Sequence, residues 1–477
     1  MRNVTSYCKL EQMETMDLNR PSHNTLTKHP IASLRELFAL AFPLILTTFS
    51  ASLLNLTDRF LLSYYSQEAW KACCSAMNLL YLPQLGLIII ASTSQSFVGH
   101  FKGARQDKMI GPFIWQMIYF SLLTTLLIFP LILIGKLYFH DIEVEQDATS
   151  YFRILAVANF LYPLGATLAS FYTGRGKNSI VLITNFAIQI LNILLDLLLI
   201  FGIPGFIEPH GVLGAAIATV ISQGTYCIIL FYLFSHKRHV PSFSSRSWKL
   251  NPQLLWQGLK TGIPRSFGRT VAVGAWTIAT YFLIQRGGDY LLVHSFGLTI
   301  FVILSFVNEG VGQALLTFNS HTLASNSSHH FQKSLRSSLY FIAITAALLA
   351  IPLVLLPDSI ICIFIKDPLS AQSQFYLKEC CFWVWVAIIG SGINRIGSSL
   401  ITAARDTLFY ACCLTLQWIT LCIPVFIGVE KLGMSPSKFF LIEGLNSGLM
   451  GIIFIIRFFK EPYRQLGTQS IQITLYH

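Results

Sequence analysis

Long apolar runs recur along nearly the whole chain and constrain its fold more than any other feature. Each of about twelve runs approaches the roughly 20 residues that a helix needs to cross a bilayer. Hydrophobic residues make up 53% of the chain and charged residues 12%, unlike a soluble domain. The runs therefore predict an all-α membrane protein with twelve transmembrane helices. The expected spans are roughly 36–63, 76–98, 112–136, 151–173, 179–202, 211–235, 257–284, 291–318, 335–356, 379–403, 408–428 and 436–458.

Lys and Arg residues are concentrated in alternate connections between these spans. The N-terminal tail, the even-numbered connections and the C-terminal tail are basic, whereas the third connection is acidic. Because basic loops remain on the cytoplasmic side, we expect a multi-pass protein of the cell membrane with both termini in the cytoplasm. The net charge of +11 then reflects topology, and nucleic-acid binding is disfavoured because the basic residues form no single patch.

Residues in the two halves of the chain match at a constant offset, which suggests a duplicated unit. Three pairs are separated by roughly 220 positions: Pro43 and Pro264, Phe97 and Phe318, and His100 and His321. Such repeats are common in secondary transporters. The predicted division is a cytoplasmic N-terminal tail at 1–35, a six-helix bundle at 36–235, a cytoplasmic linker at 236–256, a second six-helix bundle at 257–458 and a cytoplasmic C-terminal tail at 459–477.

Two acidic residues and an amide interrupt these apolar spans. Asn192 and Asp196 lie one helical turn apart within the fifth span, and Asp58 lies near the end of the first. A carboxylate in lipid costs at least about 2.5–3.5 kcal/mol, so it is rare unless it faces a cavity or a partner. The pattern indicates a protein that takes up a cation. A structural alternative is that Asp58 pairs with the neighbouring Arg59 and that Asp196 only hydrogen-bonds Asn192.

Several motifs in the same order resemble those of the multidrug and toxic compound extrusion (MATE) family of secondary transporters. The resemblance covers about residues 33–460. The motifs that carry it are Asn192-Ile193-Leu194-Leu195-Asp196-Leu197-Leu198-Leu199-Ile200-Phe201-Gly202, the run from Leu213 to Ser222, Gly262-Ile263-Pro264, Phe364-Ile365-Lys366-Asp367-Pro368, Trp418 and Pro424.

The resemblance implies a fold, an activity and a binding site. The fold is a V of two pseudo-symmetric six-helix bundles around a central cavity, which opens alternately to either side of the membrane. The activity is multidrug or xenobiotic efflux by antiport, driven by inward movement of H+ or Na+. The cation site of better-studied members corresponds here to Asp58, Asn192, Asp196 and Thr219.

Helix geometry independently allows these residues to meet. At about 1.5 Å rise per residue, Asp58 and Asp196 lie roughly 8–9 Å below the outer ends of their helices, and Thr219 lies roughly 12 Å below its own. Asn192 and Asp196, at positions i and i+4, share one helix face. Two neighbouring carboxylates repel each other, so sharing a proton or Na+ would stabilise the pair.

The C-terminal half departs from the family pattern. Some relatives carry an essential Glu eight residues after the Pro of the seventh helix, where this chain has Ala272. Arg265 and Arg269 instead occupy one face of that helix, one turn apart. Arg presents a planar fork that suits carboxylate or phosphate. A cavity wall of this kind suits an anionic or zwitterionic compound better than a cationic drug.

Other charges in this half leave a structural alternative open. Glu309 is expected at a depth similar to that of Arg269, roughly 14–18 Å from the inner end. A buried Arg269–Glu309 pair would lock two helices together without contacting substrate. Arg395 and Glu443 add charges in the tenth and twelfth spans. Arg265, Arg269, Glu309 and Arg395 are therefore candidates for either a substrate cavity or a structural ion pair.

The sequence predicts an antiporter that exports small organic compounds in exchange for H+ or Na+. We expect a monomer in the bilayer that needs no cofactor, no metal beyond Na+ and no nucleic acid. The first alternative is a lipid-linked precursor flippase of the same superfamily. An enzyme is disfavoured because the sequence lacks a nucleophile–base pair, a metal-ligand cluster and a Gly-rich phosphate loop. A nonconducting sensor or scaffold is a further alternative.

Overall fold

The computed structural model describes residues 26–140, 144–206, 208–237, 239–325, 330–365 and 369–460. Within them, twelve helices are long and apolar enough to cross a membrane, as predicted. The predicted tail up to residue 25, residues 366–368 of the motif after the ninth span, and residues 461–477 lie outside the described residues.

The N-terminal half supplies six of these spans, some of which consist of two or three helical segments. Its elements are α2 (Leu34–Tyr65), α3 (Gln67–Ser92), α4 (Ser94–Gly103), η1 (Asp107–Met109), α5 (Ile110–Tyr138), α6 (Glu145–Val157), η2 (Ala158–Phe160), α7 (Leu161–Thr173), α8 (Asn178–Phe201) and α9 (Gly211–Phe234). The short helix α10 (His239–Phe243) lies in the predicted linker.

The C-terminal half supplies the other six spans. Its elements are α11 (Pro252–Ile284), α12 (Gly288–Ala324), α13 (His330–Ala350), η3 (Ile351–Leu355), α14 (Pro357–Phe364), α15 (Ala371–Ala403), α16 (Thr407–Thr415), η4 (Trp418–Cys422), α17 (Ile423–Glu430) and α18 (Lys438–Lys460). The exact limits of the predicted domains stay predictions.

Several helices extend beyond the apolar runs because polar side chains cap their ends. The second span was expected at 76–98, but α3 begins at Gln67, where Ser66 Oγ accepts a hydrogen bond from the backbone N of Ala69 at 2.9 Å. In the same way, Asn251 Oδ1 accepts from the first turn of α11. These caps satisfy amide groups that a helix leaves free at its start. Hydropathy detects the apolar centre of a span and misses such ends.

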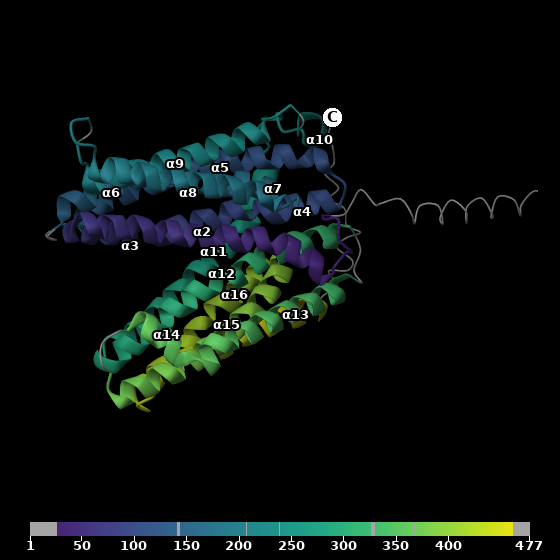
Figure 1. The fold of residues 1–477 in the computed structure, drawn as a ribbon. Coiled ribbons are helices and arrows are strands. Elements are labelled where there is room, and N and C mark those ends of the chain that lie inside the picture. Colours follow the sequence, from purple (N-terminus) through teal and green to yellow (C-terminus); the bar gives the residue numbers. More distant parts are fainter. Residues whose placement is uncertain are drawn as a thin grey trace, which may run out of the picture.

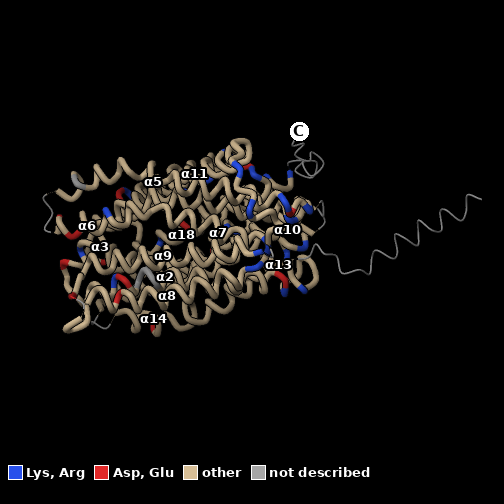
Figure 2. The backbone as a smooth tube through the Cα atoms, turned by 90° about the horizontal axis from the view of Figure 1, so that it is seen from above, with Lys and Arg blue, Asp and Glu red and all other residues tan. Residues whose placement is uncertain are grey.

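The two halves form the arms of a V (Figure 1). The arms converge at the end where α4, α10 and the start of α2 lie, which we call the tail side, and they diverge toward the opposite end, which we call the far side. Lys and Arg residues gather at the tail side, whereas acidic residues are frequent at the far side (Figure 2). The positive-inside rule places basic residues on the cytoplasmic side, so this charge distribution agrees with a tail side that faces the cytoplasm.

Polar contacts join the two arms at the tail side, between α4 and the last turns of α12. Gln95 Nε2 donates to Thr317 Oγ1 at 2.8 Å, and Thr317 Oγ1 donates to the carbonyl of Thr173 at 3.0 Å. Ser320 Oγ donates to Ser96 Oγ at 3.1 Å. We call these contacts the junction. They tie the arms together at the tail side, so this structure represents a state opened toward the far side.

A half-buried arginine with a buried guanidinium adds to the junction from the loop between α15 and α16. The guanidinium of Arg405 lies 4.0 Å from the ring centroid of Phe97, which belongs to the other arm. Burial lowers the pKa of Arg405 to about 10. The face of an aromatic ring attracts a cation, so this contact favours the closed tail side.

Candidate functional site

The structure brings three of the four predicted cation-site residues together between α2 and α8. Asn192 and Asp196 are fully buried, and Asp58 is 8% exposed. In the orientation of the Asn192 amide that satisfies its neighbours, Nδ2 lies 3.1 Å from Asp58 Oδ1 and 3.3 Å from Asp196 Oδ2. Asn192 thus lies within hydrogen-bond distance of both carboxyl groups.

The carboxyl groups of Asp58 and Asp196 also lie close enough to interact with each other. Two neighbouring ionised carboxylates repel each other, so a proton or a cation held between them would stabilise the pair. Asp196 Oδ1 is buried and has no hydrogen-bond partner among the described residues. The structural alternative had two parts: the described residues include no ion pair between Asp58 and Arg59, whereas Asn192 does lie within hydrogen-bond distance of Asp196. The arrangement is therefore suited to hold one H+ or, once both groups ionise, one cation.

Contacts between α2 and α8 set the register that aligns Asp58 with Asp196. Asn178 Nδ2 donates to the carbonyl of Leu40 at 2.7 Å, near the tail side. Farther along, Ser50 Oγ donates to Gln189 Oε1. Asp196 lies about 8 Å before the end of α8, by the usual helical rise. The pair consequently lies in the far-side half of the N-terminal arm.

Thr219, the fourth predicted residue, has a different environment. It is buried on α9, and its Oγ1 donates to the carbonyl of Ala215 at 3.0 Å. Within the described part of the chain, no contact joins this hydroxyl to the carboxyl pair. Thr219 is therefore positioned by its own helix in this state, and its part in cation binding stays a prediction.

Polar residues that sequence reasoning did not select surround the carboxyl pair. Tyr151 and Tyr162 lie close enough to Asp58 to interact with its charge. Gln84 lies near Tyr162, and its buried Nε2 has no hydrogen-bond partner in the described residues. Tyrosines are common in membrane helices, so nothing in the sequence distinguished these two. Contact with the pair marks them as candidates for supporting the site.

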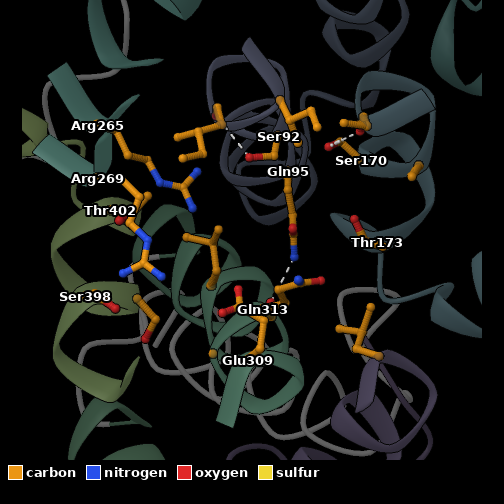
Figure 3. Close-up of a pocket in the computed structure, with 18 of the residues that line it drawn as sticks. Ser92, Gln95, Ser170, Thr173, Arg265, Arg269, Glu309, Gln313, Ser398 and Thr402 are labelled. Atoms are coloured by element: carbon orange, nitrogen blue, oxygen red, sulfur yellow. Dashed lines mark hydrogen bonds between the residues drawn. The ribbon is translucent and has the colours of Figure 1, made fainter. Parts of the chain in front are cut away.

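The four charged residues predicted for the C-terminal half line one cavity between the arms. Its volume is about 420 Å³. Figure 3 shows Arg265 and Arg269 projecting into it from one side, with Glu309 and Gln313 on another. Gln95 and Thr173 of the N-terminal arm complete the wall. The cavity is thus shared by both halves, as a site that opens alternately to two sides requires.

The ion pair of Glu309 differs from the predicted alternative. Arg395 Nη2 lies 2.5 Å from Glu309 Oε2, and the described residues include no ion pair between Glu309 and Arg269. The prediction used only depth along the membrane. In the structure α12 packs closely along α15, which carries Arg395, and contacts α11 far less. The rotation of α12 about its own axis determines which arginine Glu309 faces, and depth along the membrane does not specify that rotation.

A second cavity of about 380 Å³ adjoins the first. Both are lined by Arg269, Arg395 and Tyr410, so these side chains lie between them. The second cavity also contains Glu443, whose Oε1 accepts a hydrogen bond from Ser447 at 2.8 Å. The Arg residues therefore contact both spaces.

Comparison with known proteins agrees with the motifs. The MatE family model matches residues 43–198. The probable multidrug resistance protein NorM of Thermotoga maritima is 24% identical over 72% of this chain and 75% of its own length. The uncharacterized transporter YisQ of Bacillus subtilis is 22% identical over 93% of this chain and 98% of its own.

Solved structures share the fold at low sequence identity. A MATE transporter in complex with MaL6 has a TM-score of 0.79 and 16% identity, covering 94% of this chain and 100% of that one. A MOP-superfamily transporter from Pyrococcus furiosus, described as having a binding pocket of reversed polarity, has a TM-score of 0.78 and 15% identity, covering 92% and 98%. Together with the twelve membrane helices, the family model over residues 43–198 and the relatives support a transporter of the MATE family that exports compounds.

Proposed function

We propose that this protein is an antiporter that exports small organic compounds in exchange for H+ or Na+. The single observation that carries the proposal is the buried pair Asp58–Asp196, with Asn192 within hydrogen-bond distance of both carboxyl groups. Burying a pair of acids in the membrane is costly, so such pairs are rare unless they have a function. Uptake of a cation by this pair would supply the differential affinity that moves the arms between two states.

The transport cycle requires the cavity between the arms to open alternately to the two sides. In the present state the junction closes the tail side. Binding or release of the cation at the carboxyl pair would alter packing between α2 and α8, and α2 also packs against α12 of the other arm. We propose that this contact couples the cation site to the junction. The protein acts as a monomer and needs no cofactor beyond the coupling ion.

The proposed direction of transport depends on orientation. We propose that both termini are cytoplasmic, that the protein lies in the cell membrane, and that the tail side faces the cytoplasm. Exposed positions Asp147 and Arg246 lie on opposite sides in this arrangement. In a background without the exposed cysteines, Asp147→Cys should react with an impermeant maleimide in intact cells, and Arg246→Cys only after permeabilisation. The reverse labelling would overturn the orientation.

The coupling ion can be identified with inverted membrane vesicles. Vesicles containing the protein should accumulate a transported compound when an H+ or a Na+ gradient is imposed separately, and vesicles without it should not. A panel of anionic, cationic and neutral compounds covers the substrate classes. Transport that neither gradient drives would contradict antiport.

The arginines of the cavity favour one alternative, a lipid-linked precursor flippase. Such a protein would bind a lipid phosphate where an exporter binds a soluble compound. The flippase alternative predicts that a polyprenyl phosphate displaces a soluble anion from the cavity in a binding experiment.

A further inference from the structure

The two cavities between the arms contain more positive than negative charge. Three guanidinium groups, from Arg265, Arg269 and Arg395, line them together with the carboxyl groups of Glu309 and Glu443. Glu309 is paired with Arg395 at 2.5 Å. Even if Glu443 is ionised, three cations face two carboxylates. At least one positive charge therefore remains without a carboxylate.

The unmatched charge lies at Arg265 and Arg269. Among the residues that the structure describes, Arg265 donates only to Thr93 Oγ1, from Nη1 at 3.4 Å. Arg269 makes no hydrogen bond or ion pair with any residue that the structure describes. Each guanidinium carries five N–H donors, and donors away from bulk water are stabilised only by a partner. Most of these donors are available to a bound molecule.

The positions of the two arginines favour a particular ligand group. They are four residues apart on α11, so they lie on the same face, and both project into the cavity (Figure 3). Guanidinium groups bind carboxylate and phosphate oxygens through paired hydrogen bonds. We propose that Arg265 and Arg269 bind the acidic group of an organic anion: a carboxylate, sulfonate or phosphate.

The rest of the wall indicates the other part of the ligand. Leu44, Ile89, Leu316 and Tyr226 line the same cavity. These side chains suit an apolar or aromatic body, and a volume of about 420 Å³ is in the range of small-molecule sites. This inference rests on the proposed function and names the substrate class. The acidic group can belong to a soluble organic anion or to a lipid phosphate, whose chemistry at the arginines is the same.

Two dyes with the same ring system and opposite charge test the inference. Fluorescein is an anionic xanthene and rhodamine 6G a cationic one. Their binding to the purified full-length protein in detergent is measured by fluorescence anisotropy without an ion gradient. We expect fluorescein to bind at least about tenfold more tightly than rhodamine 6G, a difference of about 1.4 kcal/mol.

Variants assign the preference to the two arginines. Arg265→Gln and Arg269→Gln should each weaken fluorescein binding about tenfold, and Arg269→Lys less, because it keeps the charge and loses the planar fork. Arg286→Gln is the matched control. Arg286 lies just after α11 and pairs with Glu430 at 2.8 Å, outside both cavities, so fluorescein affinity should stay at the wild-type value. Arg269→Glu should reverse the preference toward rhodamine 6G.

Competition with a polyprenyl phosphate in the same micelles distinguishes a lipid phosphate from a soluble organic anion as the ligand. Displacement of the dye, or binding of this lipid alone with loss in Arg265→Gln and Arg269→Gln, supports a lipid phosphate as the anion. Fluorescein binding without competition supports a soluble anion. Tighter binding of rhodamine 6G than of fluorescein to the wild type overturns the inference. It is also overturned if either anionic probe binds the wild type and both Gln variants with equal affinity, provided that the variants elute as monodisperse protein. Because no gradient is used, those outcomes leave ion-driven export to be judged separately in vesicles.

Discussion

The acidic site of the N-terminal arm and the basic cavity between the arms accommodate buried charge in different ways. Asp58 and Asp196 are enclosed beside each other and beside Asn192, so a proton or cation held between them would reduce their charge within the site itself. Arg265 and Arg269 face a cavity and keep donors without partners in the described residues. The first arrangement suits a small cation and the second a larger anion. Under the proposed function, the driving ion and the substrate would therefore occupy separate places.

The largest effect is expected at the acidic site. Asp196→Asn and Asp58→Asn should each reduce gradient-driven export to background, because neither variant retains the pair of acids that takes up the cation. Transport is measured in proteoliposomes with an imposed gradient. Asp147→Asn, at an exposed position in the first turn of α6, is the control and should transport like the wild type. Wild-type transport rates in both Asp58→Asn and Asp196→Asn would show that the acidic site does not take up the driving cation, and the contrast with the basic cavity would be lost.

A smaller effect is expected where the arms meet. A Cβ at Gly103 would lie 2.2 Å from the carbonyl oxygen of His321 in the other arm. Because this clash exists only while the tail side is closed, Gly103→Ala should favour the opposite state by about 1–3 kcal/mol, a typical cost of overpacking. Spin labels at Glu68 and Ser359, on the far-side ends of the two arms, should move closer together.

The matched control for this change is Gly224→Ala. Gly224 lies within α9, and a Cβ there meets no atom within 4 Å. The distance between the labels should therefore stay at its wild-type value. An equal shift in both variants would show that the junction does not set the conformation.

The ion pair of the C-terminal half should affect stability moderately. Glu309→Gln leaves Arg395 without its carboxylate, and the thermal transition in detergent should fall by an amount equivalent to about 1–2 kcal/mol. This is below the cost for a fully buried pair, because the side chains of Arg395 and Glu309 are 28% and 40% exposed. Adding Arg395→Gln should recover much of the loss. A double variant less stable than either single one would contradict a pair.

The smallest effect is expected at Arg175, whose contacts stay within one half of the chain. Its guanidinium lies 3.7 Å from the ring centroid of Phe171 and 4.5 Å from that of Phe243. Arg175→Lys should cost about 0.5–1 kcal/mol of stability and leave the label distance unchanged. Arg405→Lys should change that distance, because Arg405 contacts Phe97 across the junction. Equal label distances in both variants would show that Arg405 does not contribute to closure.

The sequence predicted the features that depend on the spacing of residue types along a single helix. Apolar runs identified the twelve spans, and the i, i+4 spacing of Asn192 and Asp196 placed both on the face that meets Asp58. It did not identify the partner of Glu309, because that depends on which helices face each other. The contact between Gln95 and Thr317 was also missed, since such residues gain meaning only when two distant helices meet.

Reciprocal flux tests the central claim most directly. If the carboxyl pair couples cation to substrate, a gradient of the transported compound alone should drive H+ or Na+ in the opposite direction. In proteoliposomes without an ion gradient, the wild type should show this flux by a pH-sensitive or Na+-sensitive dye, and Asp196→Asn should show none. Substrate movement without any cation flux in the wild type, or an equal flux in Asp196→Asn, would contradict the account.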